Sequence, residues 1–147
     1  MHIPEILHKY GFGIKPLGMD VFEWVAAEMK IPVIIFDEKL IEDGISFPRT
    51  RKGKRFRVIA LKNKLPFSSL AETAWHEFGH AFYEHYGVRR FVRGSEDRFE
   101  RQADDLALCC IIPTVWVRTK SREDLLDDGF TSEQIDWRKW IYDTYKI

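Results

Sequence analysis

The sequence predicts an α+β fold, in which one helix and a small antiparallel or mixed sheet precede a helical half. Three observations predict it. Apolar residues recur at helical spacing over residues 20–30, short β-branched and aromatic runs with a turn signal follow up to residue 61, and caps with helical periodicity dominate afterwards. The 147 residues allow one core, and no repeat or linker interrupts them, so we expect a single domain over residues 1–147.

The first expected helix lies near the start of the chain. Asp20 is a suitable N-cap, and Val25 and Met29 follow at the spacing of one helical face, so the helix should extend to about Lys30. The apolar run over residues 33–36 comes next, and its length and composition are typical of a short buried strand.

Two further strands are expected over residues 45–48 and 56–61, joined by a loop over residues 49–55 that carries a lysine-glycine-lysine turn signal. The segment 49–57 is the strongest charge run of the chain. Such a run is usually a solvated hairpin tip, and binding of nucleic acid or of an acidic partner is the alternative. Because the formal net charge is zero, the overall field selects no partner, and a preference for nucleic acid would have to come from a local patch. No DNA-binding domain is evident and the hairpin-tip interpretation of the run is favoured, so we do not expect direct nucleic-acid binding.

The helical half begins with a capping box, in which Ser69 and Glu72, three residues apart, bond each other's backbone. This helix should reach about Tyr86 and stop at Gly87. Further helices should run from a cap at Ser95 to about Ile112, before Pro113, and from caps at Ser121 and at Thr131 or Ser132.

The first of these helices contains His76-Glu77-Phe78-Gly79-His80, which has the H-E-x-x-H form. Residues four apart leave nearly the same face of a helix, so both imidazoles can reach one ion, and imidazole pairs suit zinc. Glu77 lies on the flank of that face, where it can reach a metal-bound water as a general base. The alternative is a helix with two structural histidines.

A catalytic zinc site needs a third protein ligand and one open position. His85 follows too soon after His80 and points to the far side of the same helix. The third ligand is therefore a carboxylate or comes from the N-terminal part, where His2 and His8 remain.

The second long helix offers Glu100 and Asp104, four apart and on one face. Ala103 and Ala107 lie on the same stripe, where small residues let two helices approach closely. Glu100 would complete the ligand set, and Asp104 could accept the outer N–H of a ligand imidazole and fix its tautomer. The alternative is a solvated acidic edge balanced by neighbouring arginines.

Zinc in such a site would lower the pKa of its bound water, and Glu77 would take the proton and deliver it to the leaving amine. Tyr83, Tyr86 and Arg138 are candidates for stabilising the oxyanion, and packing or surface roles are their alternatives. Manganese or iron could also fill two histidines and one carboxylate, so zinc is the leading choice.

These motifs resemble the ImmA/IrrE family of metallopeptidases. The resemblance rests on residues 76–80, on the E-x-x-A-D-x-x-A pattern of residues 100–107, and on the Ile-Ile-Pro of residues 111–113. Leu106 stands where that family usually has Phe, and Cys109-Cys110 replaces bulkier aliphatic residues, so only packing is affected. The glutamate followed by an aspartate four residues later is the gluzincin pattern, which implies a zincin-like fold.

The resemblance implies a zinc endopeptidase whose substrate is a partner helix-turn-helix transcriptional repressor of a phage, mobile-element or stress-response system. The alternative is a non-catalytic module, stabilised by zinc, that binds a repressor or another protein. Residues 1–13 contain no export signal and no run is long enough to cross a membrane, so we expect a cytoplasmic protein without a membrane partner. The adjacent Cys109 and Cys110 should be buried free thiols.

Overall fold

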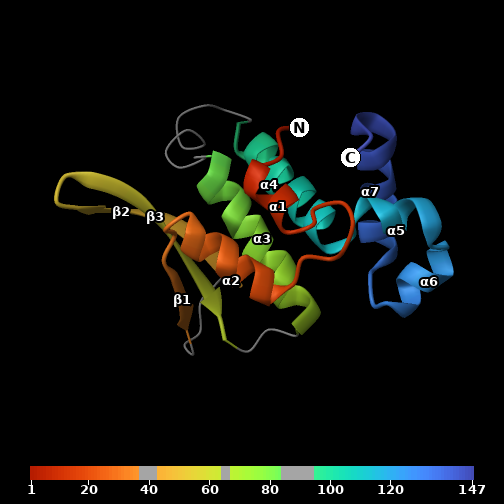
Figure 1. The fold of residues 1–147 in the computed structure, drawn as a ribbon, viewed down its shortest axis with the longest axis horizontal. Helices are drawn as coiled ribbons and strands as arrows, with labels where there is room; N and C mark the ends of the chain where they lie inside the picture. Colours follow the sequence, from red (N-terminus) through yellow and green to blue (C-terminus); the bar gives the residue numbers. More distant parts are fainter. Residues whose placement is uncertain (37–42, 64–66, 84–94) are drawn as a thin grey trace.

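The computed structural model describes residues 1–36, 43–63, 67–83 and 95–147, with the backbone alone for 67–69 and 95–97 (Figure 1). It confirms the predicted α+β class: a small mixed sheet accompanies a helical half. The elements are α1 (Glu5–Lys9), α2 (Met19–Glu28), β1 (Val33–Phe36), β2 (Gly44–Arg51), β3 (Lys54–Lys62), α3 (Phe67–Tyr83), α4 (Ser95–Ile111), α5 (Thr114–Thr119), α6 (Arg122–Asp127) and α7 (Ser132–Tyr145).

The sheet has the strand order β1-β3-β2, with β1 parallel and β2 antiparallel to β3. β1 is shorter than its neighbours and is less buried than predicted. Ile34 and Ile35 are 40% and 52% exposed, because β1 pairs with β3 alone and lies at an edge of the sheet.

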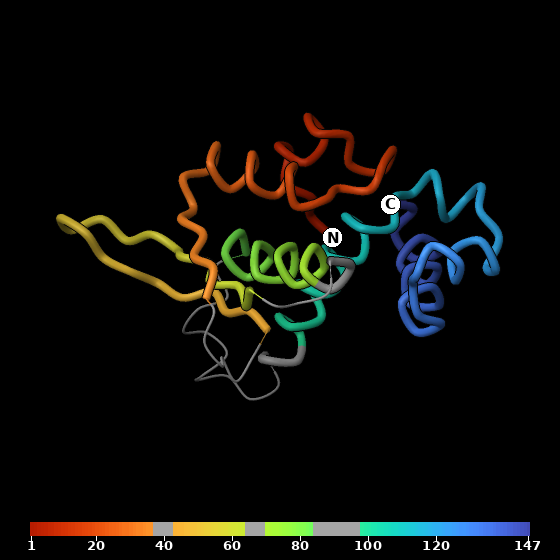
Figure 2. The backbone as a smooth tube through the Cα atoms, turned by 90° about the horizontal axis from the view of Figure 1, so that it is seen from below, coloured from red at the N-terminus to blue at the C-terminus, as the bar shows by residue number. Residues whose placement is uncertain are grey.

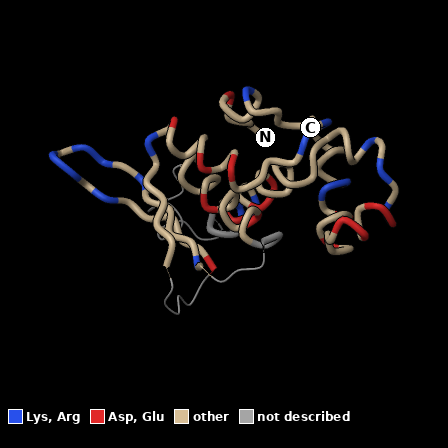
Figure 3. Tube along the Cα trace, turned by 60° about the horizontal axis from the view of Figure 1, so that its bottom comes forward, with Lys and Arg blue, Asp and Glu red and all other residues tan. Residues whose placement is uncertain are grey.

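The β2–β3 hairpin is longer than predicted and projects well beyond the helices (Figures 1 and 2). Its strands continue through the expected loop and leave only Lys52 and Gly53 between them. Both residues have positive φ, 51° and 74°, as a two-residue hairpin turn requires. Apolar alternation marked only the base of the hairpin, whereas the paired outer part is basic (Figure 3).

The helix starts differ from two predictions. The N-cap of α2 is Gly18, so Asp20 lies within the first turn, where its carboxylate complements the helix dipole instead of capping. α3 begins at Phe67, so Ser69 lies inside the helix and is not its N-cap. The predicted end of this helix at Tyr86 and Gly87 falls outside the described residues.

The later helices agree closely with prediction. α4 spans Ser95–Ile111, Ser121 caps α6 by accepting the Asp124 N–H, and Thr131 forms a capping box with Gln134 in α7. The short helices α1 and α5 were not predicted, since five or six residues carry too little periodicity to be recognised. None of the helices in the described part of the chain is long and apolar enough to cross a membrane.

α3 is the central element of the fold, lying among α2, α4 and the sheet (Figure 2). Trp75 is fully buried, packs edge-on against Phe22 and Phe78, and donates its indole N–H to the Leu17 carbonyl at 2.8 Å. Cys109 and Cys110 are buried free thiols, as predicted. One face of α3 is thus fixed in the core, which holds the opposite face rigidly towards α4.

Candidate metal centre

Three side chains converge between α3 and α4. His76 Nε2 lies 3.1 Å from one Glu100 carboxylate oxygen, His80 Nε2 lies 3.1 Å from the other, and the two nitrogens are 3.0 Å apart. Ligands at about 2.0–2.1 Å from a tetrahedral ion are about 3.3–3.4 Å from each other. Each of these contacts is close to that spacing, and one ligand atom from each of the three side chains lies within 4.8 Å of the others, as binding of a common ion requires.

Helix geometry and one glycine bring these groups together. His76 and His80 are one turn apart on α3, and their ring centroids are 4.7 Å apart. Gly79 faces α4, where a Cβ added to it would lie 3.0 Å from the Ala103 Cα and 3.3 Å from its Cβ. The absence of a side chain at Gly79 therefore allows the backbone of α4 to approach closely enough for Glu100 to reach both imidazoles.

Asp104 lies one turn after Glu100 and orients the first imidazole. Its carboxylate accepts a hydrogen bond from His76 Nδ1 at 2.8 Å. In the neutral ring that a metal requires, a proton on Nδ1 leaves the lone pair on Nε2, the nitrogen that faces His80 and Glu100. Asp104 therefore contacts the outer ring nitrogen of His76, and its role in supporting a metal ligand stays a prediction.

The carboxylates also determine where protons sit in the metal-free cluster. Burial lowers the pKa of His76, but hydrogen bonds to Asp104 and Glu100 outweigh it and raise this pKa to about 10. Hydrogen bonds from His76 and His80 hold the pKa of Glu100 well below its ordinary range. At neutral pH the carboxylates of Glu100 and Asp104 thus surround a protonated His76 imidazole. The position of this positive charge is one that a metal cation could occupy instead.

Glu77 sits beside the cluster and is only 7% exposed. One of its carboxylate oxygens lies 4.0 Å from His76 Nε2, so the carboxylate is beside the three candidate ligands and is not one of them. Its stem packs against the start of β2, where a Cβ added to Gly44 would lie 3.1 Å from the Glu77 Cγ and 2.8 Å from Thr73. The strand therefore limits the positions that Glu77 can adopt.

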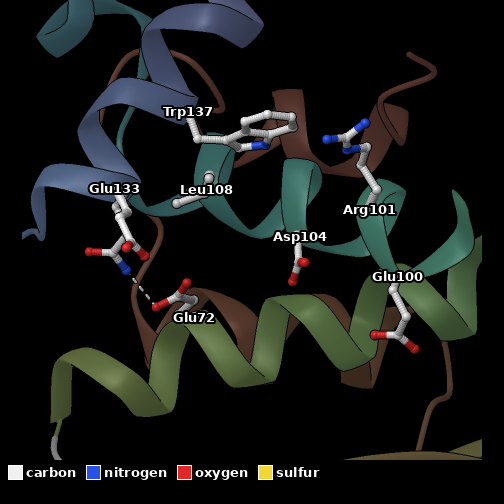
Figure 4. Close-up of a pocket in the computed structure, with 8 residues that line it drawn as sticks. Glu72, Glu100, Arg101, Asp104, Leu108, Glu133 and Trp137 are labelled. Carbon is white, nitrogen blue, oxygen red and sulfur yellow. Dashed lines mark hydrogen bonds between the residues drawn. The ribbon is translucent and has the colours of Figure 1, made fainter. Parts of the chain in front are cut away.

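Two cavities adjoin at the cluster. The first, with a volume of about 270 Å³, is lined by Asp43, Gly44, Glu72, Thr73, His76, Glu77 and Asp104. The second, of about 440 Å³, shares Glu72 and Asp104 with it and extends to α7 (Figure 4). Figure 4 shows Glu72 on α3 and Asp104 and Glu100 on α4 facing the gap between the two helices. The cluster therefore opens into an elongated space with a largely acidic lining.

The model of the family described as IrrE N-terminal-like domain, Peptidase_M78, matches residues 23–127. The chain belongs to this family. Neither the curated proteins nor the solved structures yielded a significant match. The resemblance inferred from the motifs is thus confirmed, and this M78 peptidase carries its His-His-Glu cluster well inside the matched region.

Two of the three residues suggested as oxyanion donors, Tyr83 and Arg138, take part in other contacts in this M78 peptidase. The Tyr83 hydroxyl donates to the His2 carbonyl at 2.5 Å. Arg138 is 1% exposed and donates to the carbonyls of Ile112 and Ile147, which gives it a structural role between α4 and the end of the chain. These contacts lend no support to either as an oxyanion donor, and Tyr86 lies outside the described residues.

The donor set fits a divalent metal ion. Two imidazole nitrogens and a carboxylate oxygen are ligands that zinc, iron and manganese accept, and the three atoms lie within 4.8 Å of one another. The peptidase family and this cluster together indicate a metal-dependent peptidase. Sequence reasoning did not identify Gly79, Gly44 or Glu72 as parts of the site, although a glycine inside the H-E-x-x-H helix was a signal of close helix packing.

Proposed function

We propose that this chain is a zinc-dependent endopeptidase in which His76, His80 and Glu100 bind the metal and Glu77 is the general base. The observation that carries the proposal is the convergence of His76, His80 and Glu100, whose ligand atoms lie within 4.8 Å of one another, with the carboxylate of Glu77 beside them. A structural zinc site usually closes its fourth position with another protein ligand. Here the metal ligands adjoin a cavity, which favours a catalytic site.

Zinc, when bound, supplies a Lewis acid for the scissile carbonyl and a water whose pKa is shifted towards 7. Glu77 would accept the proton of the attacking water and pass it to the leaving amine. Its limited exposure and its contact with Gly44 hold it at the wall of the cavity, so it is positioned before substrate arrives. Asp104 would keep the His76 lone pair on Nε2 throughout.

The adjoining cavities support a polypeptide substrate. Glu72 lines both of them and also a third, of about 280 Å³, with apolar walls that include Leu17, Ile111 and Phe130. This succession offers an extended peptide an acidic stretch next to the metal and an apolar pocket beyond it. We propose a cytoplasmic helix-turn-helix transcriptional repressor as the partner, a choice that rests on the family resemblance alone.

The experiment is incubation of the purified, zinc-loaded chain with the repressor encoded by a neighbouring gene, analysed by mass spectrometry. The wild type should produce two fragments from one internal bond. Glu77→Gln should retain zinc and lose about 10²–10⁴-fold in rate, the usual share of a general base. Intact repressor beside the zinc-loaded wild type would favour a non-catalytic binding module, and full activity of Glu77→Gln would exclude Glu77 as the base.

A further inference from the structure

The outer half of the β2–β3 hairpin, residues 49–57, forms a basic arm. It contains six lysines and arginines and no acidic residue. The rest of the chain then has 17 basic and 23 acidic residues, a net charge of −6 that the zero total conceals. The arm projects from the body and Lys and Arg recur along it (Figure 3). A strong local positive field is therefore present, although the composition of the whole chain does not show it.

The cations of the arm face several directions. The pairing of Arg51 with Lys54 and of Arg49 with Phe56 places Arg49, Arg51 and Lys54 on one face of the ribbon. Arg55 lies on the other face and Lys52 at the turn. All five side chains are exposed. A ribbon with cations on both faces and at its tip can meet negative charges on two sides at once.

Two features of the arm are unfavourable for folding. Arg51 and Lys54 are directly opposite each other, and like charges in that relation destabilise a strand pair. Lys52 has φ 51°, a left-handed conformation that is unfavourable for most residues with a side chain and that Asn or Gly adopts more easily. Charge is thus placed where neutral residues would make a more stable hairpin, which points to a use for the charge.

We propose that the basic arm binds the phosphate backbone of duplex DNA. A two-stranded ribbon fits the major groove, which is about 12 Å wide, and cations on both faces can then contact the phosphates on either side. β2 spans about 25 Å from Gly44 to Arg51, so the tip reaches well away from the acidic body.

The same surface suits a protein partner less well. Protein interfaces draw most of their energy from buried aromatic or apolar anchors, whereas residues 49–55 are exposed and contain no apolar side chain. Phosphate binding needs no such anchor, because release of condensed counterions drives it. The sequence analysis favoured a solvated hairpin tip over nucleic-acid binding, and the projection of the arm from the body is our reason for proposing the alternative.

The test is binding of the full-length chain to a fluorescein-labelled DNA duplex of mixed sequence, followed by anisotropy at several salt concentrations. Each phosphate contact contributes about −0.9 to the slope of log affinity against log salt, so the five exposed cations of the arm allow a slope of up to about −4.5. Arg51→Gln/Lys54→Gln should reduce the magnitude of the slope by about 2. This variant removes a like-charge pair, so it should fold at least as well as the wild type.

Lys15→Gln/Arg118→Gln is the matched control, because it removes two exposed charges from the body of the protein. It should leave the slope nearly unchanged. Lys52→Asn distinguishes a loss of DNA binding from a loss of folding. Asn adopts the positive φ of this turn more easily than Lys, so we expect a higher melting temperature together with weaker DNA binding. If Lys52 had only a structural role in the turn, the variant would change stability alone.

Three results would overturn the proposal: no DNA binding at about 50 mM salt, equal losses in the arm variant and in the control, or competition by polyglutamate as effective as competition by unlabelled DNA. The last result would assign the arm to an acidic protein instead. None of these measurements depends on peptidase activity, so a negative result for DNA binding would not affect the proposed cleavage reaction.

Discussion

Gly79 of α3 lies so close to Ala103 of α4 that a methyl group on Gly79 would meet the Ala103 backbone at 3.0 Å. Backbone cannot move aside as a flexible side chain can, so this contact sets the distance between the two helices. The imidazoles belong to one helix and the carboxylate of Glu100 to the other, and the metal cluster exists only at that distance.

Gly79→Ala should therefore damage the site. The added methyl group would gain about 1 kcal/mol in helix propensity but cost about 1–3 kcal/mol through overpacking, with a net loss of stability. The larger effect should be on metal affinity, since Glu100 would move away from both histidines. Thermal melts and zinc titration against a chelator measure the two effects. A variant that is more stable and binds zinc like the wild type would show that the contact at Ala103 does not limit the helix spacing.

Asp104→Asn should weaken zinc binding by about 10–100-fold, because the carboxylate that fixes the His76 tautomer would be replaced by a weaker acceptor. Competition with a chelator of known affinity provides the measurement. Asp105→Asn is the matched control, since the neighbouring carboxylate accepts from the Trp137 indole instead of from a ligand imidazole. Equal losses in the two variants would attribute the effect of Asp104 to general charge or to folding.

The protonation of His76 predicts a pH dependence in two directions. Its pKa in the metal-free fold, about 10, is above the ordinary 6.5. The protonated form therefore stabilises the metal-free protein fully below pH 6.5, and this contribution is lost as the pH rises through 10. Metal must displace that proton, so the apparent zinc affinity should rise by about tenfold per pH unit between about pH 7 and 9. Chelator competition across this pH range provides the measurement, and a constant zinc affinity would contradict the expected proton displacement.

The paired thiols offer a probe of the core. Burial raises the pKa of Cys109 to about 11 and that of Cys110 well above its ordinary value. The native protein should react slowly with iodoacetamide at about pH 8, because alkylation requires an exposed thiolate. Denaturant should expose both cysteines to rapid labelling, which mass spectrometry can count. Rapid labelling of the native protein would place the thiols outside the core.

The local part of the site was predictable from the sequence, and the part that depends on distant approach was not. The spacing of His76, Glu77 and His80 is a property of one helix, so three residues sufficed to predict it. Predicting Glu100 as the third ligand required a comparison of the other histidines and carboxylates that could reach the same ion. Gly44 could not be recognised, because its role depends on a strand that packs against α3 from more than thirty residues earlier in the chain.

The fold shows the same division. Long helices with clear periodicity, such as α4, agreed with prediction to within a residue. The exposure of Ile34 and Ile35 was missed because an apolar run does not reveal that its strand lies at a sheet edge. The hairpin was predicted too short for a similar reason: cross-strand pairing continued through charged residues that have no apolar alternation.

X-ray absorption at the zinc edge of the zinc-loaded protein would show whether His76, His80 and Glu100 hold the metal. The account predicts a first shell of nitrogen and oxygen at about 2.0–2.2 Å that includes two imidazoles, and loss of that imidazole signal in His76→Ala/His80→Ala. A first shell containing sulfur at about 2.3 Å, or a spectrum that the double variant leaves unchanged, would place the metal elsewhere and contradict the assignment of His76, His80 and Glu100.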